Sequence, residues 1–254
     1  MTTPPTTSGP AQTGLLVRKA AERGSTDIGW LDSRHTFSFG RYRDPVWRAF
    51  GPLRVMNDDR VAPGAGFGTH PHRDMEIISY VVSGHLEHQD SAGHGSIIGP
   101  GGVQVMSAGT GIEHSEFNPN AHQPVRFLQI WIEPDRTDHE PSHDSREFAP
   151  ARTPNSLQLI VSGDGRDGSL AIHRDADISA LSLDGSTRVD IPRGGDRRVW
   201  IQVVSGSVTA HLGGADAVEL AEGDGAGLES ESASAEQSIT LSGEGEVLVF
   251  SIAG

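Results

Sequence analysis

Three histidines and one glutamate stand at spacings that would let them meet at one point. His70 and His72 form a His-x-His pair, and His114 and Glu116 form a His-x-Glu pair further along the chain. Side chains two residues apart in a β-strand point to the same side. Two adjacent strands could therefore direct three imidazoles and one carboxylate at a single divalent transition metal. Such a set leaves positive charge on the metal, and it leaves coordination positions open if the metal takes five or six ligands.

The surroundings of the first pair strengthen the metal interpretation. A His-x-His pair alone is weak evidence, because surface histidines reach this spacing by chance. Gly64 precedes the pair and Glu76 follows it, and the distant His-x-Glu pair adds two further groups. Without a metal, several same-facing polar groups would be buried in strands, and each would cost several kcal/mol unless it were paired. The spacing leaves open whether Glu76 or Glu116 is the carboxylate ligand.

Composition limits the kinds of protein to which the chain can belong. Its 254 residues suit two domains, and its 32 glycines and 15 prolines favour many short strands joined by turns. The net charge of −14 disfavours direct binding to nucleic acid. The absence of cysteine excludes disulfides, thiolate metal sites and cysteine catalysis. No stretch is long and apolar enough to span a membrane and no signal peptide is evident, so we expect a cytoplasmic protein.

Turn signals divide the chain into an all-β arrangement of two domains. Residues 1–14 are polar and predict a disordered tail, 15–133 the metal-binding domain, 134–154 a charged, Pro-rich linker, and 155–254 a second domain. The strand-like runs that carry this prediction are 37–39, 53–55, 77–82, 104–106 and 126–132 in the first domain, and 157–161, 198–204 and 247–252 in the second.

The two halves resemble divergent copies of each other. Residues 80–84 match 202–206 at an offset of 122, and the same offset lays 99–102 on 221–224. At that offset the candidate ligands are not repeated in the second half. His70 aligns with Pro192, His72 with Gly194, His114 with Glu236 and Glu116 with Ser238. The second domain is therefore expected to keep the scaffold and to lack the metal.

Other patterns are interpreted as structural. His139-Glu-Pro-Ser-His143 matches a zinc-protease string, which works only on a helix, and Pro141 would break that helix. Gly64-x-Gly-x-Gly68 leads into a strand and not into a helix N-terminus, so it is no dinucleotide fingerprint. His88 follows the strand and turn after the candidate ligands, and it could line the mouth of a pocket that leads to the metal. A last group is expected to belong to the core, namely Phe39, Phe67, Met106 and Trp131.

Several segments resemble those of the pirin family, in particular its bacterial quercetinase-like members. Gly64-x5-His70-x-His72-x3-Glu76 is similar to the first cupin motif, and Pro100-x-Gly102 is similar to part of the second. The closer resemblance to pirins lies in Phe67-Gly-Thr-His-Pro-His72, Met106-Ser-Ala-Gly-Thr-Gly-Ile112, His114-Ser-Glu116 and Gln129-Ile-Trp131, and it continues through Gly163-Asp-Gly-Arg-Asp-Gly-Ser169 and Arg198-Val-Trp-Ile-Gln202. The resemblance implies a bicupin, that is, two antiparallel β-barrel or jelly-roll domains with one metal in the first.

The resemblance also implies the ligand set and a function. It selects Glu116 over Glu76 as the carboxylate ligand beside His70, His72 and His114. It favours iron, although nitrogen and oxygen ligands also suit Ni, Cu, Mn or Zn. The implied activity is oxidative ring opening of a flavonol-like planar aromatic by dioxygen, with Glu116 as the catalytic base. The alternative is a non-enzymatic metal-binding regulator that acts through a protein partner.

Overall fold

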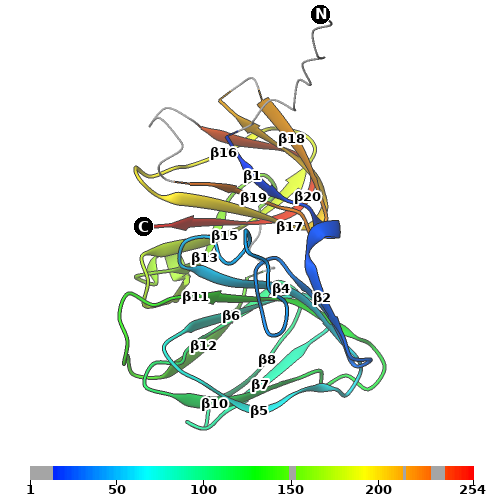
Figure 1. The fold of residues 1–254 in the computed structure, drawn as a ribbon, viewed down its shortest axis with the longest axis vertical. Helices are drawn as coiled ribbons and strands as arrows, with labels where there is room; N and C mark the ends of the chain where they lie inside the picture. The colour runs from blue at the N-terminus through cyan, green and yellow to red at the C-terminus, as the bar shows by residue number, and fades with distance from the viewer. Residues whose placement is uncertain (1–13, 149–152, 214–215, 230–237) are drawn as a thin grey trace, which may run out of the picture.

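Strands dominate the computed structural model, which describes residues 14–148, 153–213, 216–229 and 238–254. Three sheets of the described residues build two barrels stacked along the long axis of the molecule (Figure 1). The all-β class predicted from the sequence is confirmed. The expected disordered tail lies outside the described residues except for Gly14. No helix among the described residues is long and apolar enough to cross a membrane.

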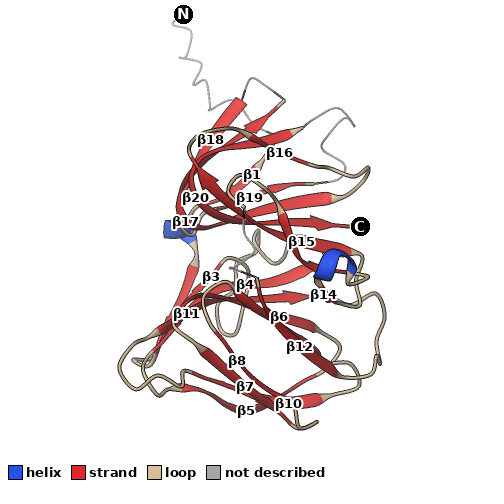
Figure 2. Ribbon diagram, turned by 180° about the vertical axis from the view of Figure 1, so that it is seen from behind, coloured by secondary structure: helices blue, strands red, loops and turns tan. Residues whose placement is uncertain are grey.

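The lower barrel in Figure 1 consists of two facing antiparallel sheets (seen from behind in Figure 2). The seven-stranded sheet has the order β12 (Ser142–Glu147), β9 (Gly102–Ser107), β6 (Glu76–Ser83), β11 (Val125–Ile132), β4 (Leu53–Val61), β3 (Leu31–His35) and β2 (Gly24–Asp27). The four-stranded sheet has the order β5 (Gly66–His72), β10 (Ile112–Phe117), β7 (Leu86–Asp90) and β8 (Gly95–Ile98).

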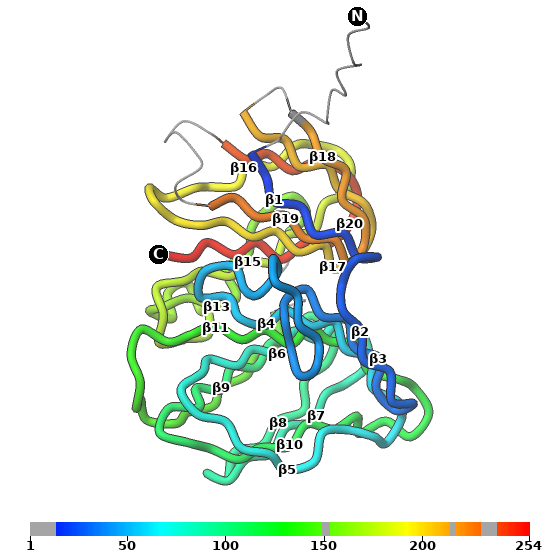
Figure 3. Tube along the Cα trace, viewed as in Figure 1, coloured from blue at the N-terminus to red at the C-terminus, as the bar shows by residue number. Residues whose placement is uncertain are grey.

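The upper barrel is one curled nine-stranded sheet that contains the C-terminal half. Its order is β1 (Leu16–Arg18), β19 (Gly225–Leu228), β17 (Arg198–Leu212), β20 (Ile239–Ile252), β15 (Ala176–Asp184), β13 (Gln158–Ser162) and β14 (Leu170–Ala171), with β16 (Val189–Ile191) on β20 and β18 (Asp216–Ala221) on β17. The short helices η1 (Ala20–Glu22) and η3 (Arg166–Gly168) complete the described elements. Since β1 pairs with β19, the described part of the chain starts on the upper barrel and passes through η1 to the lower one (Figure 3).

The seven-stranded sheet is buried on both faces because the upper barrel covers its outer face. Tyr80 and Leu128 of this sheet belong to the same buried cluster as Trp200 and Phe250 of the upper sheet. The ring of Phe37 lies 5.2 Å from that of Trp200. Residues 37–39 were expected to form a strand but form a loop with one isolated bridge, and they serve this packing instead. Burial on both faces explains the nearly continuous apolar runs in β6 and β11.

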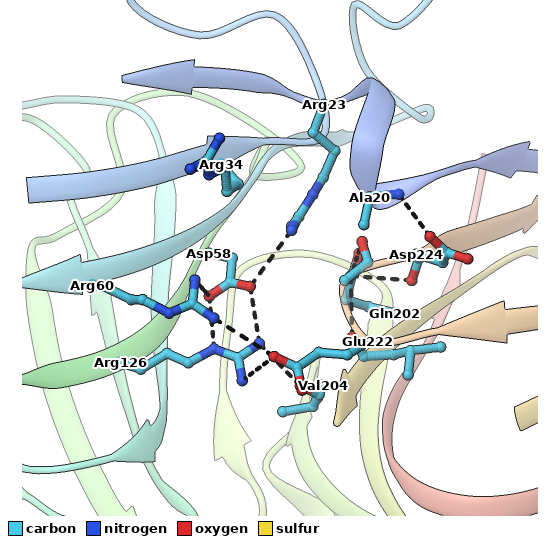
Figure 4. A network of polar contacts seen from close by, with 12 residues as sticks. Ala20, Arg23, Arg34, Asp58, Arg60, Arg126, Gln202, Val204, Glu222 and Asp224 are labelled. Carbon is cyan, nitrogen blue, oxygen red and sulfur yellow. Dashed lines mark hydrogen bonds and ion pairs between the residues drawn. The ribbon is translucent and has the colours of Figure 1, made fainter. Parts of the chain in front are cut away.

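A buried cluster of charges joins the two barrels (Figure 4). Asp58 on β4 accepts two hydrogen bonds of 2.9 Å from Arg126 on β11. Arg126 also contacts Glu222 at 2.9 Å and donates to the Val204 carbonyl at 3.0 Å, both in the upper barrel. Burial raises the pKa of Asp58, but Arg126 and the neighbouring arginines outweigh it and hold that pKa below its usual range. The contact between barrels is therefore both apolar and ionic.

The predicted internal repeat is present in the pairing of the strands. Ile77 pairs with Met106 in the lower barrel as Val199 pairs with Leu228 in the upper, so both partners are shifted by 122. The Gly101 amide donates to the Val81 carbonyl as the Gly223 amide donates to that of Val203. The strands β6 and β7 of the lower barrel correspond in the upper barrel to one continuous strand, β17.

The offset is not kept to the end of the repeat. Ile132 lies opposite Glu76, whereas Ile252 lies opposite Arg198, so the last strand is shifted by 120. At the ligand strand the offset differs again, because Asp90 and His88 lie opposite His114 and Glu116 whereas Leu212 and Ala210 lie opposite Ile239 and Leu241. The register therefore matches His114 and Glu116 with Ile239 and Leu241, at an offset of 125, and not with Glu236 and Ser238. Glu236 lies outside the described residues.

The expected linker contains an edge strand of the lower barrel. Strand β12 pairs with β9 along its whole length, with Ser142 opposite Ser107 and Glu147 opposite Gly102. Its polar composition suits an edge strand, since one edge and one face remain open to water and charged residues there block pairing with other chains. The domain boundaries at 134 and 154 otherwise remain predictions.

Candidate metal centre

Strands β5 and β10 bring the three predicted histidines together. In the antiparallel register His70 lies opposite His114, and His72 lies opposite Ile112. The ring centroids are 4.5 Å apart for His70 and His114, 4.8 Å for His70 and His72, and 4.9 Å for His72 and His114. The alternation of side chains along a strand thus produces the cluster that the spacing predicted.

The nitrogen atoms of this cluster fit a metal ion. The Nδ1 of His70 lies 2.8 Å from the Gly68 carbonyl and donates to it, which leaves Nε2 as the free lone pair. The Nε2 of His114 is buried without a hydrogen-bond partner among the described residues. One ligand atom from each of the three histidines lies within 4.8 Å of the others. A buried nitrogen without a partner is costly, and coordination would satisfy it.

Burial keeps the imidazoles of His72 and His114 neutral. It lowers the pKa of His72 to about 4, with a smaller contribution from the neighbouring charge of His70. Burial also lowers the pKa of His114 to about 2, and the other histidines of the cluster add to the effect. Because a metal ligand must offer a lone pair, these histidines are ready to bind near neutral pH.

Glu116 lies in the interior beside the cluster. Its carboxylate accepts hydrogen bonds from Gln129 at 2.6 Å, Gln104 at 2.8 Å and Ser79 at 2.9 Å. Burial raises its pKa, and these hydrogen bonds oppose the shift. A register shift separates His114 from Glu116 on β10. The trio of His70, His72 and His114 does not include Glu116, which instead forms a second possible trio with His114 and His88.

Glu76 has different partners. It accepts a hydrogen bond from Ser107, and its other oxygen lies 3.4 Å from Nδ1 of His173, which comes from the C-terminal half. Neither group of potential metal ligands among the described residues includes Glu76. This arrangement favours Glu116 over Glu76, although the ligand role of Glu116 stays a prediction. The ligand histidines are not among these partners of Glu76, so it does not orient them as a neighbouring carboxylate that is not itself a ligand could have been expected to do.

A cavity of about 220 Å³ opens beside the cluster. Its walls include His70, His72 and Glu116 together with the rings of Phe39, Phe67 and Trp131, and its polar lining is Thr26, Ser33, His35, Asn57, Asp59 and Gln129. The three aromatic residues were expected to be core, and they also line the cavity, although Phe67 and Trp131 pack against buried apolar clusters as expected. Met106 is buried in the core as expected.

Asp59 is a cavity residue that the sequence analysis missed. Its side chain is buried, and its Oδ1 has no hydrogen-bond partner among the described residues. Burial raises its pKa to about 7, which a hydrogen bond from Ser33 partly offsets. The available signal was the alternation along β4, which places Asp59 on the cavity face while Asp58 faces the other barrel.

The structure also tests the predictions made for His88 and for the string from His139 to His143. His88 does not line the mouth of the pocket, because it is fully buried behind His114. His139 and His143 are not on a helix, since His143 belongs to strand β12 and Nε2 of His139 contacts Asp135 at 2.6 Å. The rejection of the zinc-protease string is confirmed.

Comparison with known protein families assigns a family to each half of the chain. Residues 16–132 match the family Pirin, and residues 159–252 match the quercetinase C-terminal cupin domain. The chain belongs to the pirin family, and its bicupin fold is thereby established.

Individual relatives agree with this assignment. Quercetin 2,3-dioxygenase of Escherichia coli K12 is 43% identical over 94% of this chain and 98% of its own length. A putative quercetin 2,3-dioxygenase of Mycobacterium tuberculosis is 43% identical over 82% of this chain and 84% of its own. The crystal structure of E. coli YhhW superposes with a TM-score of 0.86 at 43% identity, covering 94% and 97% of the two chains. A crystal structure of this bacterial pirin in complex with nickel(II) superposes with a TM-score of 0.85 at 42% sequence identity, and the match covers 94% of this chain and 98% of the other.

Proposed function

We propose that this chain is a metal-dependent dioxygenase of the quercetin 2,3-dioxygenase type, which opens the central ring of a flavonol. The observation that carries the proposal is the cluster of His70, His72 and His114 at the wall of an aromatic-lined cavity. Relatives that share nearly the whole chain bear the same enzyme name. These comparisons support the enzyme and not the alternative of a non-enzymatic regulator.

The metal would be held by His70, His72 and His114, with Glu116 as the proposed fourth ligand. When bound, it would lower the pKa of a coordinated substrate hydroxyl and mediate the reaction with dioxygen. Iron remains the choice implied by the family resemblance, while the crystal structure of a relative in complex with nickel(II) supports nickel as the alternative. Cu, Mn and Zn fit the same nitrogen and oxygen donors.

Glu116 is suited to accept the proton of the flavonol hydroxyl. Its burial raises its pKa, so the carboxylate is a stronger base than one in water. Gln129 donates to Oε2, while Gln104 and Ser79 donate to Oε1, which fixes the direction of both oxygens. A proton taken up from the substrate would be held there while the ring is opened.

The aromatic walls fit a planar substrate. Phe39, Phe67 and Trp131 supply ring faces and edges, and Asp59 supplies an unpaired acceptor for a substrate hydroxyl. Phe39 and Trp131 also line an adjoining open groove of about 780 Å³. A three-ring flavonol could therefore place its reacting ring by the metal and extend past these two residues into the groove.

Oxygen uptake with a panel of flavonols tests the proposal. The protein would be stripped of metal, reloaded separately with Fe, Ni, Cu, Mn or Zn, and compared with the His114→Ala variant treated in the same way. We expect flavonol-dependent oxygen consumption with at least one metal and none in the variant. No consumption with any metal and any flavonol would reject the enzyme and leave the regulator as the leading hypothesis. The cytoplasmic location stays a prediction.

A further inference from the structure

We infer that His88 and Asp90 form a chain behind His114 that fixes which nitrogen of this imidazole faces the metal. The inference rests on the proposed metal site, and it assigns a positioning role to two residues of strand β7. Both lie behind the ligand and away from the cavity, because neither contributes to its lining.

The distances define the direction of the chain. The Nδ1 of His114 lies 3.3 Å from Nδ1 of His88, and Nε2 of His88 lies 3.6 Å from Oδ2 of Asp90. If His114 offers Nε2 to the metal, its Nδ1 carries the proton and donates it to Nδ1 of His88. His88 must then carry its own proton on Nε2, facing the carboxylate. One assignment of tautomers thus gives a hydrogen bond from His114 to His88 and directs the second proton of His88 at the carboxylate of Asp90. At 3.6 Å this second contact is electrostatic, since Nε2 of His88 has no hydrogen-bond partner among the described residues.

Asp90 is an anchored carboxylate. Its Oδ1 accepts the backbone amides of Ala92 and His94, both at 2.9 Å, and its Oδ2 lies 3.0 Å from Nδ1 of His94. Gly93 has a φ of 92°, a conformation that lets the turn close around the side chain. Burial raises the pKa of Asp90, but the hydrogen bonds from His94 and Ala92 outweigh it and hold the pKa below its usual range. The negative charge at the end of the chain is therefore built into the turn.

His88 is held in a fixed orientation. Its side chain has no exposed surface, and its ring stacks on that of His143 with centroids 4.3 Å apart and planes 11° from parallel. His143 comes from β12, and its Nε2 lies 3.4 Å from the Ser96 hydroxyl. No hydrogen bond joins His143 to His114 among the described residues, so His143 shares the packing of His88 without its contact to the ligand.

The chain would affect the metal through its ligand. A partner on the second nitrogen of a ligating imidazole fixes the ring and raises its basicity, and loss of such a partner typically weakens metal binding by about 10–100-fold. The alternative role for His88 is direct coordination, since His88, His114 and Glu116 could together hold a second ion. The two roles differ in the number of metals bound.

The decisive variant is His88→Phe, which keeps a ring to stack on His143 and removes both nitrogens. Ni(II) titration of the full chain should show binding about 10–100-fold weaker than wild type. The Cu(II)-loaded protein should show a changed electron paramagnetic resonance spectrum. The matched control His143→Phe should leave both unchanged. His88→Gln, whose amide oxygen can accept the same proton, should recover part of the affinity, and circular dichroism would confirm that each variant is folded.

Three results would overturn the inference. A folded His88→Phe variant with wild-type nickel affinity and an unchanged copper spectrum would show that the chain has no effect on the site. A wild-type protein with two nickel ions, of which His88→Phe loses one, would make His88 a ligand. Wild-type protein that binds no nickel, or a His114→Ala variant that binds it normally, would reject the proposed metal site and the inference with it.

Discussion

The two barrels share a backbone plan and differ in the chemistry placed on it. Gly84 and Gly206 occupy matching positions and have φ angles of 78° and 80°. In both barrels a Cβ at this glycine would press against the backbone of a facing strand. At the offset of 122, His70 and His72 align with Pro192 and Gly194, which line an open pocket of the upper barrel and offer no side-chain ligand for a metal. In the strand register Ile191 lies opposite Ile239 where His70 lies opposite His114, and it offers no ligand either.

The comparison separates what the fold requires from what the site requires. Turn glycines and strand registers recur because both barrels must close. The candidate ligand histidines, by contrast, belong to one barrel. Both groups of potential metal ligands among the described residues lie in the lower barrel. The upper barrel instead supplies the apolar and ionic surface that covers the seven-stranded sheet.

The largest expected effect is on metal binding. His72→Ala or His114→Ala removes a ligand and should abolish the binding of about one metal per chain, as measured by elemental analysis of purified protein. His211→Ala is the control in the upper barrel, where Nε2 of His211 lies 3.1 Å from the Ser242 hydroxyl. Full metal content in either ligand variant would contradict the proposed set.

Breaking the ionic contact between the barrels should strongly reduce stability. Arg126→Met leaves Asp58 buried without its bidentate partner and with only the longer contacts to Arg60 at 3.5 Å and Arg23 at 3.6 Å. The cost in the free energy of unfolding should approach about 3–5 kcal/mol, which is what a buried charge without any partner costs. Arg166→Met removes an exposed pair with Asp177 within the upper barrel and should cost less than about 1 kcal/mol. Denaturant titration measures both, and equal losses would show that Arg126, which joins Asp58 of the lower barrel to Glu222 and the Val204 carbonyl of the upper one, does not stabilise the contact between the barrels.

The two carboxylates of the lower barrel should differ in catalysis. Glu116→Gln keeps the size of the side chain but removes its basicity, so flavonol turnover should fall by about 10²-fold or more while metal affinity falls modestly. Glu76→Gln should reduce both less, because Glu76 contacts Ser107 and His173 and not the cluster. Steady-state kinetics with metal analysis decides between them. Loss of metal in Glu76→Gln alone would reverse the assignment.

The smallest effect concerns the shared turns. Gly84→Ala and Gly206→Ala each force a side chain into the left-handed region, which should cost at least about 1–2 kcal/mol. Thermal unfolding of the two variants should show similar losses. A loss confined to one of them would mean that the turns are not equivalent and would weaken the repeat.

The local part of the site could be predicted, because alternation within a strand is a property of the sequence. The pairs His70 with His72 and His114 with Glu116 follow from it. Asp59 was missed as a site residue, and His88 was assigned to the mouth of the pocket and not to its place behind His114. Both positions depend on which strands face each other, and no spacing along the chain encodes that. The strand within 134–154 was missed for the same reason, since only its pairing with β9 orders a polar segment.

The repeat was predicted over most of its length. The predicted offset was wrong for the last strand, which is shifted by 120 and not by 122. Short sequence matches such as 80–84 with 202–206 do not reveal a change in loop length elsewhere in the repeat. Phe39 and Trp131 were taken for core because burial and pocket lining select the same residue types.

Anomalous X-ray scattering from crystals grown with the metal tests the central claim most directly. We predict one peak per chain, in the lower barrel, within coordination distance of His70, His72, His114 and Glu116. A peak in the upper barrel near Pro192 and Gly194, or a lower-barrel peak bound by Glu76 in place of Glu116, would contradict the account.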